Sequence, residues 1–110
     1  MSGDRLIGEV TAWPGVTVEE GRFGSTRFML GRRELGHVHG SSILDLPLPK
    51  ALKAELIERG VAIQHRFTRP ESGWVTIELD DADAVERSIE ILRERYEHAV
   101  ALRDARAEPR

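Results

Sequence analysis

The chain has 110 residues, of which 40% are hydrophobic and 32% charged, with a formal net charge of −3 and no cysteine. This length predicts a single domain with one core, and the composition is typical of a globular protein rather than a disordered one. The absence of cysteine excludes disulfides, thiolate metal ligands and a cysteine nucleophile. No apolar run is long enough to cross a membrane and the N-terminus does not resemble a signal peptide, so we expect a cytoplasmic protein without a membrane partner.

The first predicted element is a helix in which Leu6, Ile7 and Val10 recur at helical spacing. It ends at the Trp-Pro-Gly sequence of residues 13–15, because proline and glycine both interrupt helices. Strands follow, since residues 25–39 alternate and turn at Gly31-Arg32, where glycine suits a tight hairpin. A second turn at residues 40–42 returns the chain through a fourth strand.

A second helix is predicted over residues 47–60, which begin with prolines and end in glycine. Residues 62–67 and 74–79 alternate as two further strands, and a long C-terminal helix then begins at Asp80 or Asp81. Its charged end, residues 104–110, is expected to fray. The order helix, four strands, helix, two strands, helix predicts one α+β domain over residues 1–110, with an antiparallel sheet of about six strands packed against helices.

The glycine-rich sequence of residues 36–40 contains two histidines, His37 and His39, one residue apart. In a strand these side chains leave the same face about 6.6 Å apart. A hairpin turning at Gly31-Arg32 also places Phe28 opposite Leu35, so that both apolar side chains would share the face of the histidines.

A three-residue second turn places His37 opposite Asp45, close enough for a hydrogen bond between imidazole and carboxylate. On the fifth strand, His65 alternates in step with apolar residues 63 and 67. We therefore expect His37, His39 and His65 to point into one pocket between the sheet and a helix. These histidines and Asp45 are the candidate catalytic residues.

Three interpretations of the histidines remain open at this stage. They can be structural groups satisfied by hydrogen bonds, ligands of one metal ion, or general bases that act without a metal. Arg32 and Arg33, at the first turn, are candidates for binding an anionic ligand, and Trp74 is a candidate for stacking on one or for anchoring the core. Neither a nucleophile elbow nor a phosphate-binding glycine loop is present.

Four features occur together in the chain: the sequence RFMLGRRELGHVHG, the sequence LDLPLPKALKAELIERG, the histidine at 65 and the sequence SGWVTIEL. In combination they resemble the luciferase domain family, a group of short bacterial proteins of unknown function. The resemblance extends from about residue 13 to residue 101. Its most specific part is the segment Gly36 to Gly40 with Asp45, followed by His65 and the Ser-Gly-Trp of residues 72–74.

The family takes its name from fungal luciferase, which oxidises a hydroxylated pyrone with molecular oxygen and needs neither a metal nor a flavin. The resemblance implies a pocket for an enolisable or phenolic small molecule, no cofactor, and an oxygenase-like reaction that begins with proton removal. It also implies that His37, His39 and His65, which match the family's histidines, bind the ligand or take its proton. We expect His37, supported by Asp45, to be the base.

A second resemblance is to the MmcQ/YjbR-like proteins, on the order of the elements, the Trp-Pro-Gly-Val of residues 13–16 and the late tryptophan strand. It implies the same compact α+β fold and, as an alternative function, a non-catalytic module for protein or nucleic acid that binds through the surface from Arg22 to Arg33. The net charge of −3 makes nucleic acid the less favoured partner.

Overall fold

The helices and strands follow one another in the predicted order, and the computed structural model describes residues 2–107. The elements are α1 (Ser2–Thr11), β1 (Val16–Glu20), the short 3₁₀ helix η1 (Arg22–Gly24), β2 (Thr26–Leu30), β3 (Arg33–His39), β4 (Ile43–Pro47), α2 (Lys50–Glu58), β5 (Ile63–Gln64), β6 (Trp74–Glu78) and α3 (Ala82–Ala107). The predicted α+β fold is therefore confirmed. Helix α3 includes residues 104–107 of the segment expected to fray, and residues 108–110 lie outside the described residues.

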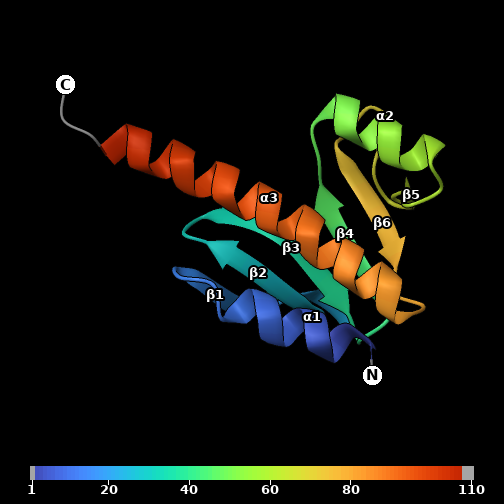
Figure 1. Ribbon diagram of the computed structural model, residues 1–110, viewed down its shortest axis with the longest axis horizontal. Coiled ribbons are helices and arrows are strands. Elements are labelled where there is room, and N and C mark those ends of the chain that lie inside the picture. Colours follow the sequence, from blue (N-terminus) through green and yellow to red (C-terminus); the bar gives the residue numbers. More distant parts are fainter. Residues whose placement is uncertain (1, 108–110) are drawn as a thin grey trace.

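All six strands form one antiparallel sheet in the order β1-β2-β3-β4-β6-β5. The chain leaves β4 through α2, forms the edge strand β5 and returns as β6 between the two, as Figure 1 shows. Because β5 has only two residues, His65 lies just beyond the strand on which it was predicted.

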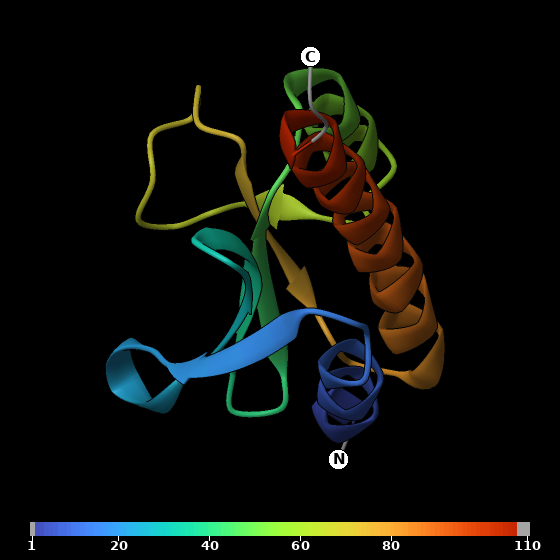
Figure 2. The ribbon, with the colours of Figure 1, turned by 90° about the vertical axis from the view of Figure 1, so that its left-hand side faces the viewer.

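One face of the sheet is covered by α1 and α3, which also pack against each other (Figure 1). The core on this face joins both helices to the sheet and includes Leu6, Val10, Phe28, Leu35, Val38, Leu44, Leu46, Val75, Ile77, Val85, Ile89, Leu92, Tyr96 and Ala99. Figure 2 shows the opposite face free of α-helices. Beside this open face lie η1 and the loop that follows β5.

A β-bulge in β3 corrects the predicted register. The first pairs beyond the Gly31-Arg32 turn are as predicted, but Met29 pairs with Glu34 whereas Phe28 pairs with Gly36, which leaves Leu35 as an extra residue. Side chains beyond a bulge change face relative to a regular strand. Leu35 and Val38 thus both reach the core, and the prediction that Phe28 and Leu35 share a face with the histidines is wrong.

Candidate functional site

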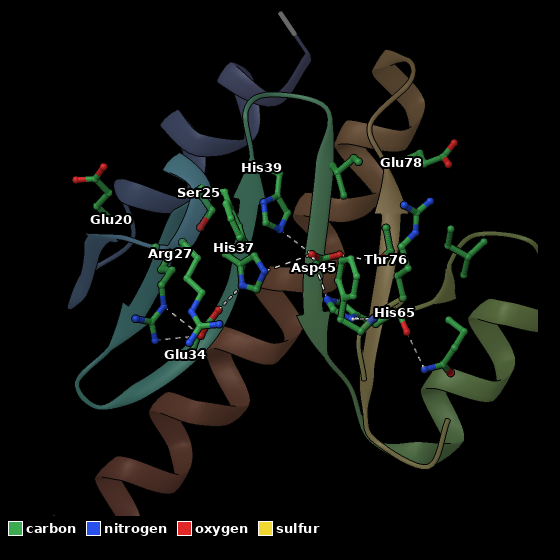
Figure 3. A pocket seen from close by; sticks show the side chains of 18 residues that line it. Glu20, Ser25, Arg27, Glu34, His37, His39, Asp45, His65, Thr76 and Glu78 are labelled. Carbon is green, nitrogen blue, oxygen red and sulfur yellow. Dashed lines mark hydrogen bonds and ion pairs between the residues drawn. The ribbon is translucent and has the colours of Figure 1, made fainter. Parts of the chain in front are cut away.

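A cavity of about 1370 Å³ lies on the open face of the sheet and is lined by all three predicted histidines (Figure 3). Its floor comes from β2, β3, β4 and β6, and its walls come from residues 20–25 and 63–67. The prediction of one shared pocket is confirmed. Its predicted place between the sheet and a helix is wrong, because the bulge at Leu35 directs His37 and His39 away from the helices.

Four polar residues form one row across the floor of the cavity. Arg27 on β2 pairs with His37 on β3, which pairs with Asp45 on β4, which in turn pairs with Thr76 on β6. The predicted pairing of His37 with Asp45 is confirmed. Paired residues of neighbouring strands project on the same side, so backbone pairing alone brings these side chains together.

Asp45 is the centre of the site. The residue is 4% exposed, and its Oδ2 atom lies 3.0 Å from Nε2 of His39 and 3.3 Å from Nε2 of both His37 and His65. The hydroxyl of Thr76 donates a hydrogen bond of 2.6 Å to the other oxygen, Oδ1. One buried carboxylate therefore orients three imidazoles, two from β3 and one from the loop after β5 (Figure 3).

His37 lies between two carboxylates. Its Nδ1 is 2.6 Å from Glu34, and Glu34 also accepts hydrogen bonds from the guanidinium of Arg27, at 3.2 and 3.3 Å. The hydrogen bond to Asp45, and then the one to Glu34, raise the pKa of His37 against the opposing effect of burial. Both carboxylates thus favour the imidazolium form of His37 relative to the same ring in water.

The loop backbone fixes the tautomer of His65. The amide of Phe67 can only donate, and it donates to Nδ1 of His65 at 3.2 Å. The proton of a neutral His65 is consequently on Nε2, the atom that faces Asp45. This ring is a fixed donor toward the carboxylate.

A metal ion at this site would be bound by atoms of the histidine cluster. Donor atoms of His37, Asp45 and His65 all lie within 4.8 Å of one another, a spacing at which three ligands can surround one ion. An imidazole that binds a metal through Nε2 needs its proton on Nδ1, where His65 accepts from a backbone amide instead. The chemistry of the donor set therefore favours a hydrogen-bonded cluster over a metal centre.

Elemental analysis of protein purified without a histidine tag is expected to find no stoichiometric zinc, iron or copper. The reason is that a metal at Nε2 of His65 must break the hydrogen bond from Phe67 or remove the last proton of the ring. Near-stoichiometric metal in the parent protein that disappears in Asp45→Asn would contradict this prediction. Glu97→Gln, on the distant helix face, is the control for surface binding.

The charge of Asp45 connects the site to the stability of the fold. Burial alone raises the pKa of this carboxyl, but hydrogen bonds from His37 and Thr76 and the charge of His65 outweigh it and lower the pKa to about 2, from an ordinary value of 3.8. The ionised carboxylate is therefore stabilised in the folded state. It contributes stability above about pH 4 that is lost as the pH falls toward 2.

Stability is expected to be greatest between about pH 4 and pH 6.5. The raised pKa of His37 acts in the opposite sense to that of Asp45, because its stabilisation is complete below its ordinary value of 6.5 and is lost as the pH rises through the raised value. The groups that face Asp45 are His37, His39 and His65, and Glu34 faces His37. Denaturant unfolding across this pH range measures both losses of stability, the one on the acid side (the acid limb) and the one on the alkaline side (the alkaline limb). The acid limb amounts to about 2 kcal/mol of unfolding free energy.

The Asp45→Asn variant provides the control for this profile. It removes the titrating carboxyl and the main partner of His37, so both the acid limb and the alkaline limb should shrink. An acid limb of unchanged size in Asp45→Asn would contradict the assignment.

Of the three predicted ligand-binding residues, only Trp74 lies at the site. Its ring centroid is 5.3 Å from that of His37 and 6.0 Å from that of His65, so it packs against both imidazoles without lining the cavity. Arg32 and Arg33 are exposed at the β2–β3 turn and do not line the cavity.

Sequence reasoning missed several residues of the site. The arginines that line the cavity are Arg22, Arg27 and Arg66, and the missed partners of the histidine cluster are Glu34 and Thr76. Thr76 was accessible from the sequence, because it alternates with the apolar residues of β6 and so faces away from the core. Glu34 could not be assigned to the site from the sequence, since only the bulge places it on the same face as His37.

Comparison with protein families matches residues 32–95, more than half of the chain, to the luciferase domain. The matched segment contains all of the histidine cluster, but not the segment with Arg22 and Arg27. Neither the curated proteins nor the solved structures include a match to this chain. Within residues 2–107, no helix combines the length and the apolar character needed to span a membrane.

Proposed function

This chain belongs to the luciferase domain family, and we propose that it binds a small molecule with an acidic hydroxyl, an enol or a phenol, in the cavity on the open face. In this proposal His39 takes the proton of the hydroxyl and His37 stabilises the resulting anion. The observation that carries the proposal is the convergence of three imidazoles on the single buried carboxylate of Asp45.

The base is assigned from the hydrogen bonds of His39. Its Nε2 is bonded to Asp45 at 3.0 Å, and among the described residues no hydrogen bond involves its Nδ1. A carboxylate that holds one ring nitrogen as N–H leaves the other as a proton acceptor and increases its basicity. With its side chain 38% exposed, His39 is also the histidine of the cluster most accessible to a ligand.

His37 suits the complementary role. Its raised pKa favours the imidazolium, which is a poor base but a good partner for an oxyanion. Its ring centroid is 4.9 Å from that of His39, so one ligand oxygen can lie near both rings. This assignment moves the base from His37, which the sequence favoured, to its neighbour.

Apolar residues of the floor and walls of the cavity supply the apolar part of the binding site. Ile43, Ile63 and Phe67 line it, and the last two expose 52% and 86% of their surface. Apolar walls around a few convergent polar groups are typical of small-molecule sites. An aromatic or conjugated ring attached to the hydroxyl fits this combination.

The oxygenase proposal adds one step. Removal of the hydroxyl proton produces an electron-rich conjugated anion, which can pass electrons to molecular oxygen and form a carbon–oxygen bond without a redox metal. The residues supply the proton acceptor and the positive charge, and the oxidant is oxygen itself. The alternative, a module whose histidines complete the core, has no such support, since the three histidines lie on the face opposite the core.

Calorimetric titration with methyl para-hydroxycinnamate, a neutral phenol, tests the proposal. We expect His39→Ala and His37→Ala each to weaken binding by about tenfold or more, because each removes a charge-assisted hydrogen bond to the phenol oxygen. His98→Ala, at an exposed position of α3, is the matched control and should bind like the parent. A folded parent that does not bind the phenol, or His37→Ala and His39→Ala variants that bind it normally, would refute the proposal.

A further inference from the structure

Two segments with the same dipeptide flank the cavity. Arg22-Phe23 belongs to η1, and Arg66-Phe67 belongs to the loop after β5. All four residues line the cavity, and Figure 2 shows both segments on the side of the sheet away from the helices. We call them the first and the second arm.

The first arm keeps an aromatic side chain in solvent at an energetic cost. Phe23 is 96% exposed and has a φ of 57°, a left-handed conformation that disfavours residues other than glycine. The arm is closed by a hydrogen bond of 2.8 Å from the Gly21 amide to the Ser25 carbonyl. A strained backbone that presents an unpacked aromatic ring beside a cavity indicates a binding role for that ring.

The loop that continues from the second arm is anchored by a buried cation. Lys53 on α2 is 7% exposed and donates hydrogen bonds to the carbonyls of Pro70 and Ser72, at 2.9 and 2.5 Å. The Phe67 amide is fixed on His65, yet the Phe67 ring is 86% exposed. Both arms are therefore held in place by the fold while their phenylalanines remain in solvent.

The arginines of the arms have no ion-pair partner among the described residues. Arg27, on the floor of the same cavity, is paired with Glu19 and Glu34, whereas neither Arg22 nor Arg66 lies within ion-pair distance of a carboxylate in residues 2–107. Two unpaired guanidinium groups at opposite walls of one cavity provide a site for an anionic group.

We propose that the two arms bind the outer end of the ligand, with Phe23 and Phe67 against its apolar part and Arg22 and Arg66 on a carboxylate. This inference rests on the proposed function, because it requires the hydroxyl end of the ligand to lie at the histidine cluster. The ligand is then an elongated aromatic acid with a hydroxyl at one end and a carboxylate at the other. The cavity, at about 1370 Å³, exceeds the usual 300–1,000 Å³ of ligand sites and has room for such a molecule.

The test compares two probes that differ only in charge at the outer end, para-hydroxycinnamate and its methyl ester. In calorimetric titrations the parent should bind the acid at least about tenfold more tightly than the ester, because the carboxylate gains charge-assisted hydrogen bonds. The double variant Arg22→Gln/Arg66→Gln should lose this preference while it still binds the ester. The matched control is Arg32→Gln/Arg33→Gln, since these arginines lie outside the cavity, and it should keep the preference.

A further variant, Phe23→Gly, separates binding from folding. Glycine tolerates the left-handed backbone, so the melting temperature should not fall, whereas both probes should bind more weakly. If the parent binds the ester and the acid equally, or if the Arg22→Gln/Arg66→Gln variant keeps the preference, this inference is overturned and the proposed function stands. If neither probe binds, the proposed function fails and the inference fails with it.

Discussion

Replacement of Asp45 with alanine is expected to abolish binding of phenols and to lower the free energy of unfolding by about 3 kcal/mol. Asp45 is 4% exposed, and its carboxylate accepts a hydrogen bond from Thr76 and faces the Nε2 atoms of three histidines. Its loss leaves His37 with Glu34 as the one carboxylate it contacts among residues 2–107, and leaves His39 without the bond that orients it. Urea unfolding and calorimetric titration of the same preparation measure the two effects.

Thr76→Val is the matched control for Asp45→Ala. It removes a single hydrogen bond to the same carboxylate from the neighbouring strand and keeps the side-chain volume, so it should cost about 1 kcal/mol and leave phenol binding measurable. If Asp45→Ala were no less stable than Thr76→Val, the histidine cluster would not depend on the carboxylate, contrary to the structure proposed for the site.

The second large effect is expected at Gly36, the residue that follows the bulge. It has a φ of 158°, and a Cβ atom there would lie 2.8 Å from the Asp45 carbonyl oxygen and 3.0 Å from Cβ of Leu46. Neither neighbour can move away easily, since both belong to the adjacent strand β4. Gly36→Ala should therefore destabilise the fold by about 3 kcal/mol, and it should also disturb the histidines, whose direction depends on the bulge.

Gly8→Ala tests whether the effect is particular to this position. Gly8 lies in α1, has no atom within 4 Å of the added Cβ and needs no unusual φ. Alanine should stabilise this helix by about 0.5–1 kcal/mol. A Gly36→Ala protein as stable as the parent in urea unfolding would show that the bulge tolerates a side chain and would refute the explanation of how the site is formed.

The fold could be predicted largely from local signals. The helices carry apolar side chains at helical spacing, the strands alternate, and glycine and proline mark the ends of most elements, so the element order follows from the residues themselves. The pairing of His37 with Asp45 was also predictable, because it depends only on the length of one turn.

The position of the site could not be predicted in the same way. A single extra residue, Leu35, changes which side chains of β3 reach the core, and no regular period contains that information. The arginines of the cavity could not be predicted from the sequence either. Arg32 and Arg33 are close to the histidines in sequence but lie at a turn outside the cavity, whereas Arg66 reaches the cavity from a distant loop.

The absorption spectrum of bound para-nitrophenol tests the central claim most directly, namely that the cluster takes the proton of an acidic hydroxyl. The measurement is made below the pKa of the free probe, where the free molecule is colourless and only its anion is yellow. We expect the parent protein to turn the bound probe yellow and the His39→Ala protein not to do so. Calorimetric binding to the parent without any yellow colour would show that the site holds the neutral phenol, which would contradict the claim.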